Sequence, residues 1–427
     1  MYFYLILTLL FLYNPAVLEA KESLSLDSAI RQALDNNPEI KAAQAIFLAS
    51  AKRPTQVSSL PNPTIGLRFK NVSFSEITLG EDPRTDVQAY FIQDIPFPTK
   101  LSSKRKIAEQ ISESQKWKAE SVTRKVIAEL KKEYYNWYLI NKSLDITKRN
   151  KELLEQFVKT AEIKYEVGKG IQQDVIKAQV ELSSFIHTVE HLKMKKEITE
   201  ARIRKILNLS QHVDIGSPEK IEKTDINITM DKLSEMTKNQ SPQLLEELQL
   251  VESSQEQLQL AKKQYLPDFV IQGTYYNRDG GTDNFEDLWQ VGLGLKVPLY
   301  FWRKEKPAIQ EAHLNLQASK DRYDDSTAEI LFEIKDKYIS ANTADRLMGL
   351  YKDGIIPQSQ ISLESAISGY QVGDVDFLTL LNNLITLFNF EIEYYKQLAE
   401  HEISVAMLEQ ISGVDFNKIG SGNPGRN

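Results

Sequence analysis

The sequence predicts a mainly helical protein with a membrane β-barrel portion, built from a twofold internal repeat of long coiled-coil helices and two strands in each half. The strand signal is clearest at 289–297, where apolar and polar residues alternate with period two. The apolar set of that strand is Trp289, Val291, Leu293 and Leu295. The helix signal is the run from Lys100 to Gly168, which has almost no glycine or proline before its end.

The repeat rests on residues that recur at a nearly constant offset along the chain. The pairs are Pro38 and Pro242, Pro63 and Pro267, Pro96 and Pro298, and Gly168 and Gly373, whose members lie 204, 204, 202 and 205 residues apart. Each half is therefore predicted to contain a helix, a strand pair, a very long helix, a glycine turn and a return helix.

Composition excludes several classes of function. Acidic residues outnumber basic ones, 59 to 52, so we expect no nucleic-acid partner, which normally requires a basic footprint. The chain has no cysteine, which excludes disulfides, thiolate metal sites and cysteine nucleophiles. Residues 1–20 form an apolar run that ends in Pro15 and small residues, which indicates a signal peptide and export of the remaining chain.

The first repeat is expected over 21–208 and the second over 241–412, with a connector at 209–240 and a flexible tail at 413–427. The first repeat should contain a helix capped by Asp27, a helix at about 39–59, strands at about 64–74 and 86–96, a long helix, a tip turn at 168–170 and a return helix. The second repeat should contain strands at about 268–277 and 287–298 and a tip turn at 372–375.

Four strands from one chain are too few to close a barrel, which needs about eight or more. Three copies would supply a 12-stranded barrel and a helical tunnel, so we expect a homotrimer. In such a barrel the apolar set from Trp289 to Leu295 would face lipid, and Gln290, Gly292 and Gly294 would face the lumen. Aromatic residues at the strand ends, Phe97 and 300–302, are typical of a membrane interface.

Six segments at matching places in the two halves resemble the family of TolC-like outer-membrane efflux proteins. They are LPNPTIGL, YLPDFVIQGTYY, DIPFPTKLSSK, KVPLYFWRKEK, YEVGKGIQQDVIKAQVEL and YQVGDVDFLTLLNNLITL. The resemblance implies a homotrimeric channel in the outer membrane with its helical tunnel in the periplasm. It also implies a passive exit duct, without catalysis or cofactor, whose partners are a periplasmic adaptor (membrane fusion protein) and an inner-membrane transporter of an efflux pump or a type I secretion system.

The resemblance places a gate at the two glycine turns, the periplasmic tip. The candidate tip residues are Gly168, Gln173, Asp174, Tyr370, Gly373, Thr379 and Asn382. Asp174 and Tyr370 match a tethering pair, although Asp174 could also simply stabilise a helix N-terminus. Thr379 and Asn382 stand where the family pattern has two inward aspartates, so we expect constriction by size and hydrogen bonding rather than by charge.

Three other interpretations compete with a channel. A soluble periplasmic coiled-coil scaffold or adaptor explains the long helices but not two alternating strand pairs. His187-Thr-Val-Glu-His191 fits an inverted zinc-protease motif, yet it lies within a long return helix, where we expect solvent-exposed side chains rather than a metal site. The acidic segment 279–287 faintly resembles a calcium loop, and we expect an external loop there.

Overall fold

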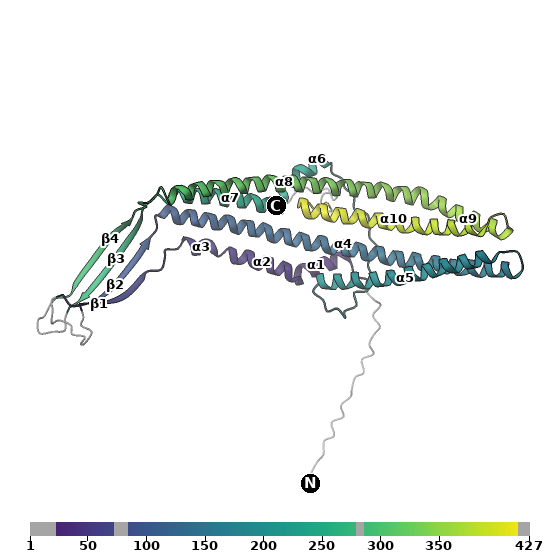
Figure 1. The fold of residues 1–427 in the computed structure, drawn as a ribbon, viewed down its shortest axis with the longest axis horizontal. Coiled ribbons are helices and arrows are strands. Elements are labelled where there is room, and N and C mark those ends of the chain that lie inside the picture. The colour runs from purple at the N-terminus through teal and green to yellow at the C-terminus, as the bar shows by residue number, and fades with distance from the viewer. Residues whose placement is uncertain (1–22, 72–83, 279–285, 417–427) are drawn as a thin grey trace, which may run out of the picture. The chain divides into compact units, whose positions relative to one another are not determined.

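The computed structural model describes residues 23–71, 84–278 and 286–416, so the expected signal peptide lies outside the described part. The first half contains α1 (Leu26–Asn36), α2 (Pro38–Ser50), α3 (Arg53–Ser58), β1 (Thr64–Lys70), β2 (Asp86–Ile95), α4 (Pro98–Glu166) and α5 (Gln172–Ile206) (Figure 1). The second half contains α6 (Met230–Gln240), α7 (Pro242–Lys263), β3 (Asp268–Asn277), β4 (Leu288–Lys296), α8 (Glu305–Leu350), η1 (Tyr351–Ile355), α9 (Ile356–Val372) and α10 (Phe377–Ser412). This succession confirms the predicted twofold repeat of long helices and strand pairs.

The chain packs as two compact units. One contains Glu133–Glu222 and Gln358–Tyr395 together with the N-terminal residues to Ala33. The other contains Leu34–Lys132, Lys223–Pro357 and the residues from Lys396 onward. All four strands lie in the second unit, whereas both glycine turns lie in the first.

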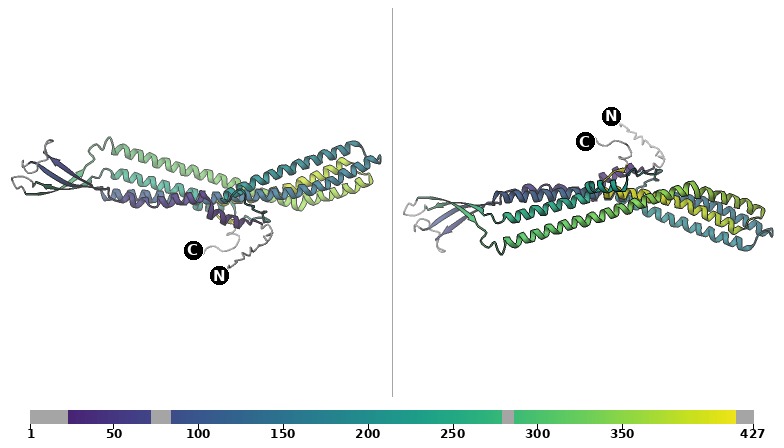
Figure 2. Two further views of the ribbon diagram at one scale, coloured as in Figure 1. Left: turned by 90° about the horizontal axis from the view of Figure 1, so that it is seen from below. Right: turned by 90° about the horizontal axis from the view of Figure 1, so that it is seen from above.

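The strands form one antiparallel sheet with the order β1-β2-β3-β4 (Figure 2). The two halves of the chain therefore meet at the pairing of β2 with β3, where Phe91 lies opposite Gly273. Strands β1 and β4 are the outer strands, and each is paired on one side within the described chain. The expected far end of the first strand, beyond Asn71, falls outside the described residues.

The sheet exposes large apolar side chains on one face and buries polar side chains of its two inner strands on the other. On the apolar face, Trp289 and Leu293 are 80% and 83% exposed. On the polar face, Asp86, Gln88 and Thr274 are buried, and Gln88 donates a hydrogen bond of 2.8 Å to Asp86. Because buried polar groups must be satisfied by hydrogen bonds, this face holds a polar network in place of an apolar core.

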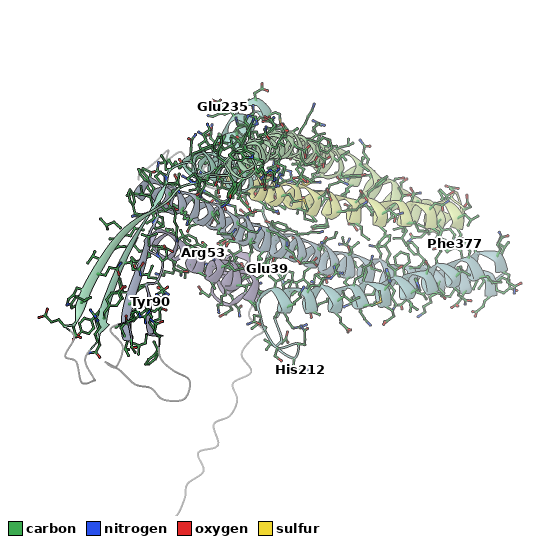
Figure 3. All side chains as sticks on the ribbon, turned by 60° about the vertical axis from the view of Figure 1, so that its left-hand side comes forward. Glu39, Arg53, Tyr90, His212, Glu235 and Phe377 are labelled. Atoms are coloured by element: carbon green, nitrogen blue, oxygen red, sulfur yellow. The ribbon has the colours of Figure 1, made fainter. Side chains whose placement is uncertain are left out.

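Gly66 illustrates how closely the side chains pack on the polar face. A Cβ atom at that position would lie 2.4 Å from the hydroxyl oxygen of Tyr90 on the neighbouring strand, so the tyrosine would have to shift. Tyr90, labelled in Figure 3, also lies beneath the guanidinium of Arg68, at 5.2 Å from ring centroid to Cζ. Glycine therefore leaves room for the tyrosine to fold across β1.

The long helices of the two halves differ at one place. Helix α4 is continuous over 69 residues, whereas its counterpart is interrupted by the π-helical turn η1 between α8 and α9. Pro357 follows this turn; it has no N–H to donate to the carbonyl of Asp353, and its ring crowds that carbonyl. A wider turn accommodates both effects without ending the helix.

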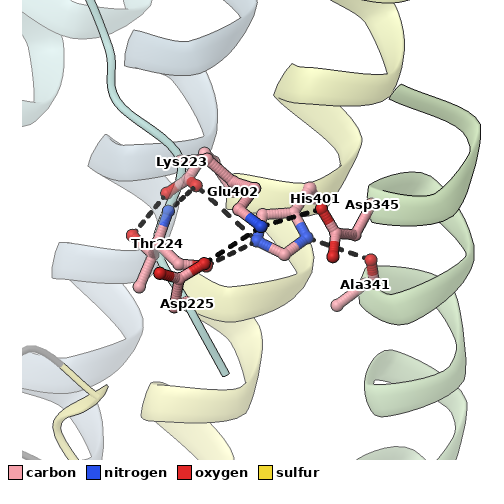
Figure 4. Close-up of polar contacts among 7 residues, drawn as sticks. All are labelled: Lys223, Thr224, Asp225, Ala341, Asp345, His401 and Glu402. Carbon is pink, nitrogen blue, oxygen red and sulfur yellow. Dashed lines mark hydrogen bonds and ion pairs between the residues drawn. The ribbon is translucent and has the colours of Figure 1, made fainter. Parts of the chain in front are cut away.

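A buried histidine fixes the connector against α8 and α10 in the second unit (Figure 4). His401 is 2% exposed, and its Nδ1 and Nε2 atoms lie 2.9 and 2.8 Å from the carbonyl oxygens of Ala341 and Thr224. Both ring nitrogens thus lie within hydrogen-bonding distance of a backbone carbonyl oxygen. The Glu402 carboxylate lies 3.8 Å from Nε2.

The same carboxylate holds the connector backbone. Glu402 Oε1 accepts a hydrogen bond of 2.7 Å from the Thr224 amide, and Oε2 accepts one of 2.9 Å from the Thr224 hydroxyl. On the exposed side, Lys223 bridges Asp225 and Asp345 at 3.0 and 2.9 Å. The connector is thus fastened by buried hydrogen bonds to Glu402 and His401 and covered by a solvated ion pair.

Three local predictions need correction. Helix α1 is capped by Ser25, whose hydroxyl accepts a hydrogen bond from the Ser28 amide, and Asp27 lies within the first turn. The helix expected at 39–59 is divided into α2 and α3, because Pro54 cannot donate a hydrogen bond in a continuing helix. The tail expected from residue 413 is packed at its start, where Val414 and Phe416 are buried in the core of the second unit.

Replacing His401 with leucine should lower the free energy of unfolding by about 2–4 kcal/mol, because the carbonyl oxygens of Ala341 and Thr224 lose their contacts with the imidazole ring. Guanidinium unfolding of the purified protein in detergent, followed by circular dichroism, measures the change. His313→Leu is the matched control, since His313 is exposed in the same unit. Equal shifts in the two variants would contradict a structural role for His401.

Candidate functional site

Two helical hairpins end in the first unit, and each turn depends on a glycine in the left-handed region. Gly168, between α4 and α5, has φ +73°, and Gly373, between α9 and α10, has φ +93°. The Lys169 amide donates to the Lys164 carbonyl at 2.8 Å, and the Asp374 amide donates to the Gly369 carbonyl at 2.9 Å. Both turns therefore end their helices with the same reversal, for which glycine is preferred.

A cavity of about 540 Å³ lies between the two turns. Five of the seven predicted tip residues line it: Gly168, Gln173, Asp174, Tyr370 and Gly373. Phe377, the first residue of α10 and labelled in Figure 3, also lines it. The structure therefore brings together residues that are about 200 positions apart in the chain, as expected from the repeat.

Lys164 connects the two hairpins. Its ammonium lies 3.8 Å from the centre of the Tyr370 ring and donates a hydrogen bond to the backbone carbonyl of the same tyrosine. Tyr370 is buried and packs edge-on against Phe377, with ring centroids 5.6 Å apart. The contact thus joins the end of α4 to the end of α9 through a cation–π interaction and a charged hydrogen bond.

Sequence reasoning did not identify Lys164. A lysine in the last turn of a helix is common, because it interacts favourably with the helix dipole and the final carbonyl groups. A lysine in this position therefore gives no sign in the sequence that it contacts Tyr370 in the other half of the chain. Among the described residues no hydrogen bond joins Asp174 and Tyr370, the pair expected to form the tether.

The two tip carboxylates occupy different environments. Burial, together with the nearby charge of Asp376, raises the pKa of Asp174. Hydrogen bonds from the amide and hydroxyl of Thr379, at 2.8 and 2.9 Å, lower the pKa of Asp376, which caps helix α10. Burial raises the pKa of Tyr370, and the charge of Asp174 adds to this effect. Asp174 therefore affects Tyr370 electrostatically.

Thr379 and Asn382 lie outside the cavity. Both are exposed and one turn apart on α10, so they share a face of the helix. Thr386 and Asn389 continue this exposed face with the same helical spacing. The face is therefore polar and uncharged over about three turns.

The residues predicted to face lipid form an uncovered apolar surface in the single chain. Val291 and Leu295 on β4 are exposed together with Trp289 and Leu293, and Phe69 and Phe91 lie on the same face of β1 and β2. Tyr300 and Trp302 are exposed just after β4. Contact of this surface with lipid stays a prediction.

Other chemical sites receive little support within the described ranges. No helix there has the length and apolar content needed to cross a membrane. No group of three or more His, Cys, Asp or Glu side chains in 23–71, 84–278 and 286–416 is arranged to hold a metal ion. His187 and His191 are exposed on α5, as expected, and most of the acidic segment 279–287 lies outside the described residues.

The fold is similar to those of solved outer-membrane channels. The outer-membrane channel OprN has 17% sequence identity and a TM-score of 0.79, with 92% of this chain and 90% of that chain covered. VceC from Vibrio cholerae has 14% identity and a TM-score of 0.77, covering 92% and 96%. The open state of the Neisseria gonorrhoeae MtrE channel has 14% identity and a TM-score of 0.75, covering 91% and 88%.

A search of the curated proteins finds no match to the sequence. The family model described as outer membrane efflux protein matches residues 29–209 and 233–414, which correspond to the two repeats. The repeat, the paired hairpins and the outward apolar sheet face accord with this match. The chain therefore belongs to the outer membrane efflux protein family.

Proposed function

We propose that the chain forms a homotrimeric exit duct in the outer membrane, as part of a tripartite efflux pump or a type I secretion system. The observation that carries this proposal is the four-stranded sheet, whose apolar face is exposed and whose polar face buries Asp86, Gln88 and Thr274 on its two inner strands. Lipid would cover the apolar face, and neighbouring copies would pair with the outer strands. Twelve strands from three copies are enough for a closed barrel.

The duct would be passive, with energy supplied by an inner-membrane transporter and the connection made by a periplasmic adaptor. Family membership supports a role in transport rather than catalysis. The helical tips would form the periplasmic gate, which opens when the two hairpins separate. The cavity lined by Asp174 and Tyr370 and the contact of Lys164 with Tyr370 support a closed arrangement at this place.

A soluble coiled-coil scaffold or adaptor without a barrel is the competing proposal. The long helices fit both proteins, but an exposed sheet face bearing Trp289 and Leu293 does not fit a protein surrounded by water. Heat-modifiable trimers that require detergent would support the duct. A detergent-free monomer would contradict it.

The first prediction concerns the two faces of β4. Leu293→Lys should destabilise the assembled channel by about 2–4 kcal/mol if the residue lies at mid-bilayer, since a charge would face lipid. Gly292→Lys is the matched control on the adjoining residue, where a Cβ atom would meet only ordinary contacts, the nearest at 3.8 Å. Yield of heat-modifiable trimer from outer membranes measures both. Similar losses in the two variants would show that the faces are assigned wrongly.

The second prediction concerns the tip. Lys164→Met should raise single-channel conductance in planar bilayers, because it removes the ammonium that joins α4 to α9 but keeps an apolar stem. Tyr370→Leu should act in the same direction, since it removes the ring. Lys169→Met is the control, because Lys169 lines the same cavity but has no contact with the Tyr370 ring among the described residues.

Tyr370→Phe separates the two possible tethers. If the tether acts through Lys164, the substitution should change little, because the ring and the backbone carbonyl remain. If the predicted Asp174–Tyr370 pair acts through the tyrosine hydroxyl, then Tyr370→Phe and the double variant Asp174→Ala with Tyr370→Phe should both raise conductance. Unchanged conductance in Lys164→Met and in the double variant would contradict a tether at this cavity.

The third prediction concerns the neutral face of α10. Asn382→Asp should shift the reversal potential in a salt gradient toward cations, because three copies would place a ring of carboxylates in the lumen. The substitution changes charge with little change in shape, and Asn382 is exposed. Asn342→Asp on α8 is a control, since its side chain donates within its own helix to Tyr338. An unchanged reversal potential in Asn382→Asp would contradict a position in the lumen.

A further inference from the structure

Two histidines form an isolated pair on helix α5. His187 and His191 are four residues apart, their ring centroids are 6.4 Å apart, and their ring planes differ by 4°. Both side chains are exposed. Among the described residues neither ring has a hydrogen bond or an ion pair, so their nitrogen atoms are not engaged by the protein. Imidazoles with this spacing on a helix can share one metal ion.

The carboxylate between the histidines is already paired. Glu190 accepts an ion-pair contact of 2.7 Å from Lys193. On the helix Glu190 lies three residues after His187 and four before Met194, so it borders the same face, with its carboxylate held by Lys193. In a zinc-protease motif of this kind the acidic residue acts as a general base rather than as a ligand, so the histidine pair needs a different third donor.

Met194 supplies such a donor. It lies three residues after His191 and seven after His187, so the three side chains form one stripe along α5. Its side chain is 47% exposed. The stripe therefore offers two imidazole nitrogens and one thioether sulfur, and the carboxylate beside it, Glu190, is paired with Lys193.

We propose that His187, His191 and Met194 bind one soft monovalent d¹⁰ metal ion, with Cu(I) as the best fit. Thioether and imidazole donors suit Cu(I), whereas a thioether is a poor ligand for Zn²⁺, which prefers four donors that include thiolate, imidazole or carboxylate. This site is separate from the tip cavity and does not depend on the proposed channel function.

The surrounding charges favour the same ion. Lys193 and Lys195 flank the stripe, and both are exposed. Lys193 is paired with Glu190, whereas Lys195 has no ion pair among the described residues. The Lys195 ammonium repels a divalent ion more strongly than a monovalent one. The two imidazoles and the thioether carry no charge, so they do not offset the repulsion of a divalent ion. Cu(I) is held mainly by coordination to nitrogen and sulfur.

Binding requires only side-chain rotation. The parallel rings must turn so that one nitrogen of each points to a common centre about 2 Å away. Since no hydrogen bond or ion pair of either ring is lost, the rotation costs little beyond the rotamer preference of exposed side chains. The backbone of α5 stays helical throughout.

Anaerobic titration of the full-length protein in detergent with Cu(I), against a chromophoric Cu(I) chelator, tests the site. The wild-type chain should bind one Cu(I) per protomer, and X-ray absorption should detect two nitrogen neighbours and one sulfur neighbour. His187→Gln with His191→Gln should abolish this uptake. Met194→Leu should remove the sulfur neighbour and weaken binding by at least about tenfold, the loss that even an outer-sphere change commonly causes.

His212→Gln with His313→Gln is the matched control, because it removes two exposed histidines elsewhere and should leave the uptake unchanged. Heat-modifiable trimer formation, compared across all variants, verifies that they assemble equally. Equal Cu(I) uptake by the wild type and by the His187/His191 double variant would overturn the site. Stoichiometric displacement of Cu(I) by Zn²⁺ would overturn the assignment of a soft monovalent ion.

Discussion

The constraint on which the structure depends is the exposure of one apolar sheet face. A row of large side chains that includes Trp289, Val291 and Leu293 is uncovered, and each buried square ångström of such surface is worth about 25 cal/mol. Within the described residues no helix lies over these side chains, as their exposure shows. On the opposite face Asp86 and Gln88 are buried and hydrogen-bonded to each other. Under the proposed channel function, lipid would cover the apolar face.

The internal repeat provides the second level of organisation. Each half supplies a strand pair, and the sheet forms because β2 and β3 pair across the two halves. The halves meet again within the other unit, where Lys164 of the first half contacts Tyr370 of the second. The corresponding long helices of the two halves differ in local geometry, because only the second contains a π-helical turn, just before Pro357. Its wider turn lets the second long helix continue past a proline that the first does not contain.

The sequence is sufficient to predict the features that depend on hydrophobic periodicity and on turn-forming residues such as glycine. Alternation at 289–297 predicts the strand β4, which spans Leu288–Lys296, and glycines mark both turns at positive φ. Features that depend on distant contacts are not predictable in this way. His401 resembles an ordinary helix residue until Ala341 and Thr224 are seen on either side of its ring. Val414 likewise appears to begin a polar tail, although it completes an apolar cluster with Leu233.

At the tip, the contribution of Lys164 depends on the groups that it contacts. An exposed ion pair in water is worth little and weakens further with salt. The Lys164 ammonium instead meets a buried aromatic ring and a backbone carbonyl, and cation–π contacts contribute about 0.5–2 kcal/mol depending on desolvation. Because the hydrogen-bond acceptor is a backbone carbonyl oxygen of α9, the contact depends on the position of the helix itself rather than on that of a mobile side chain. A displacement of α9 relative to α4 would break both parts together, which is the behaviour that the proposed gate requires.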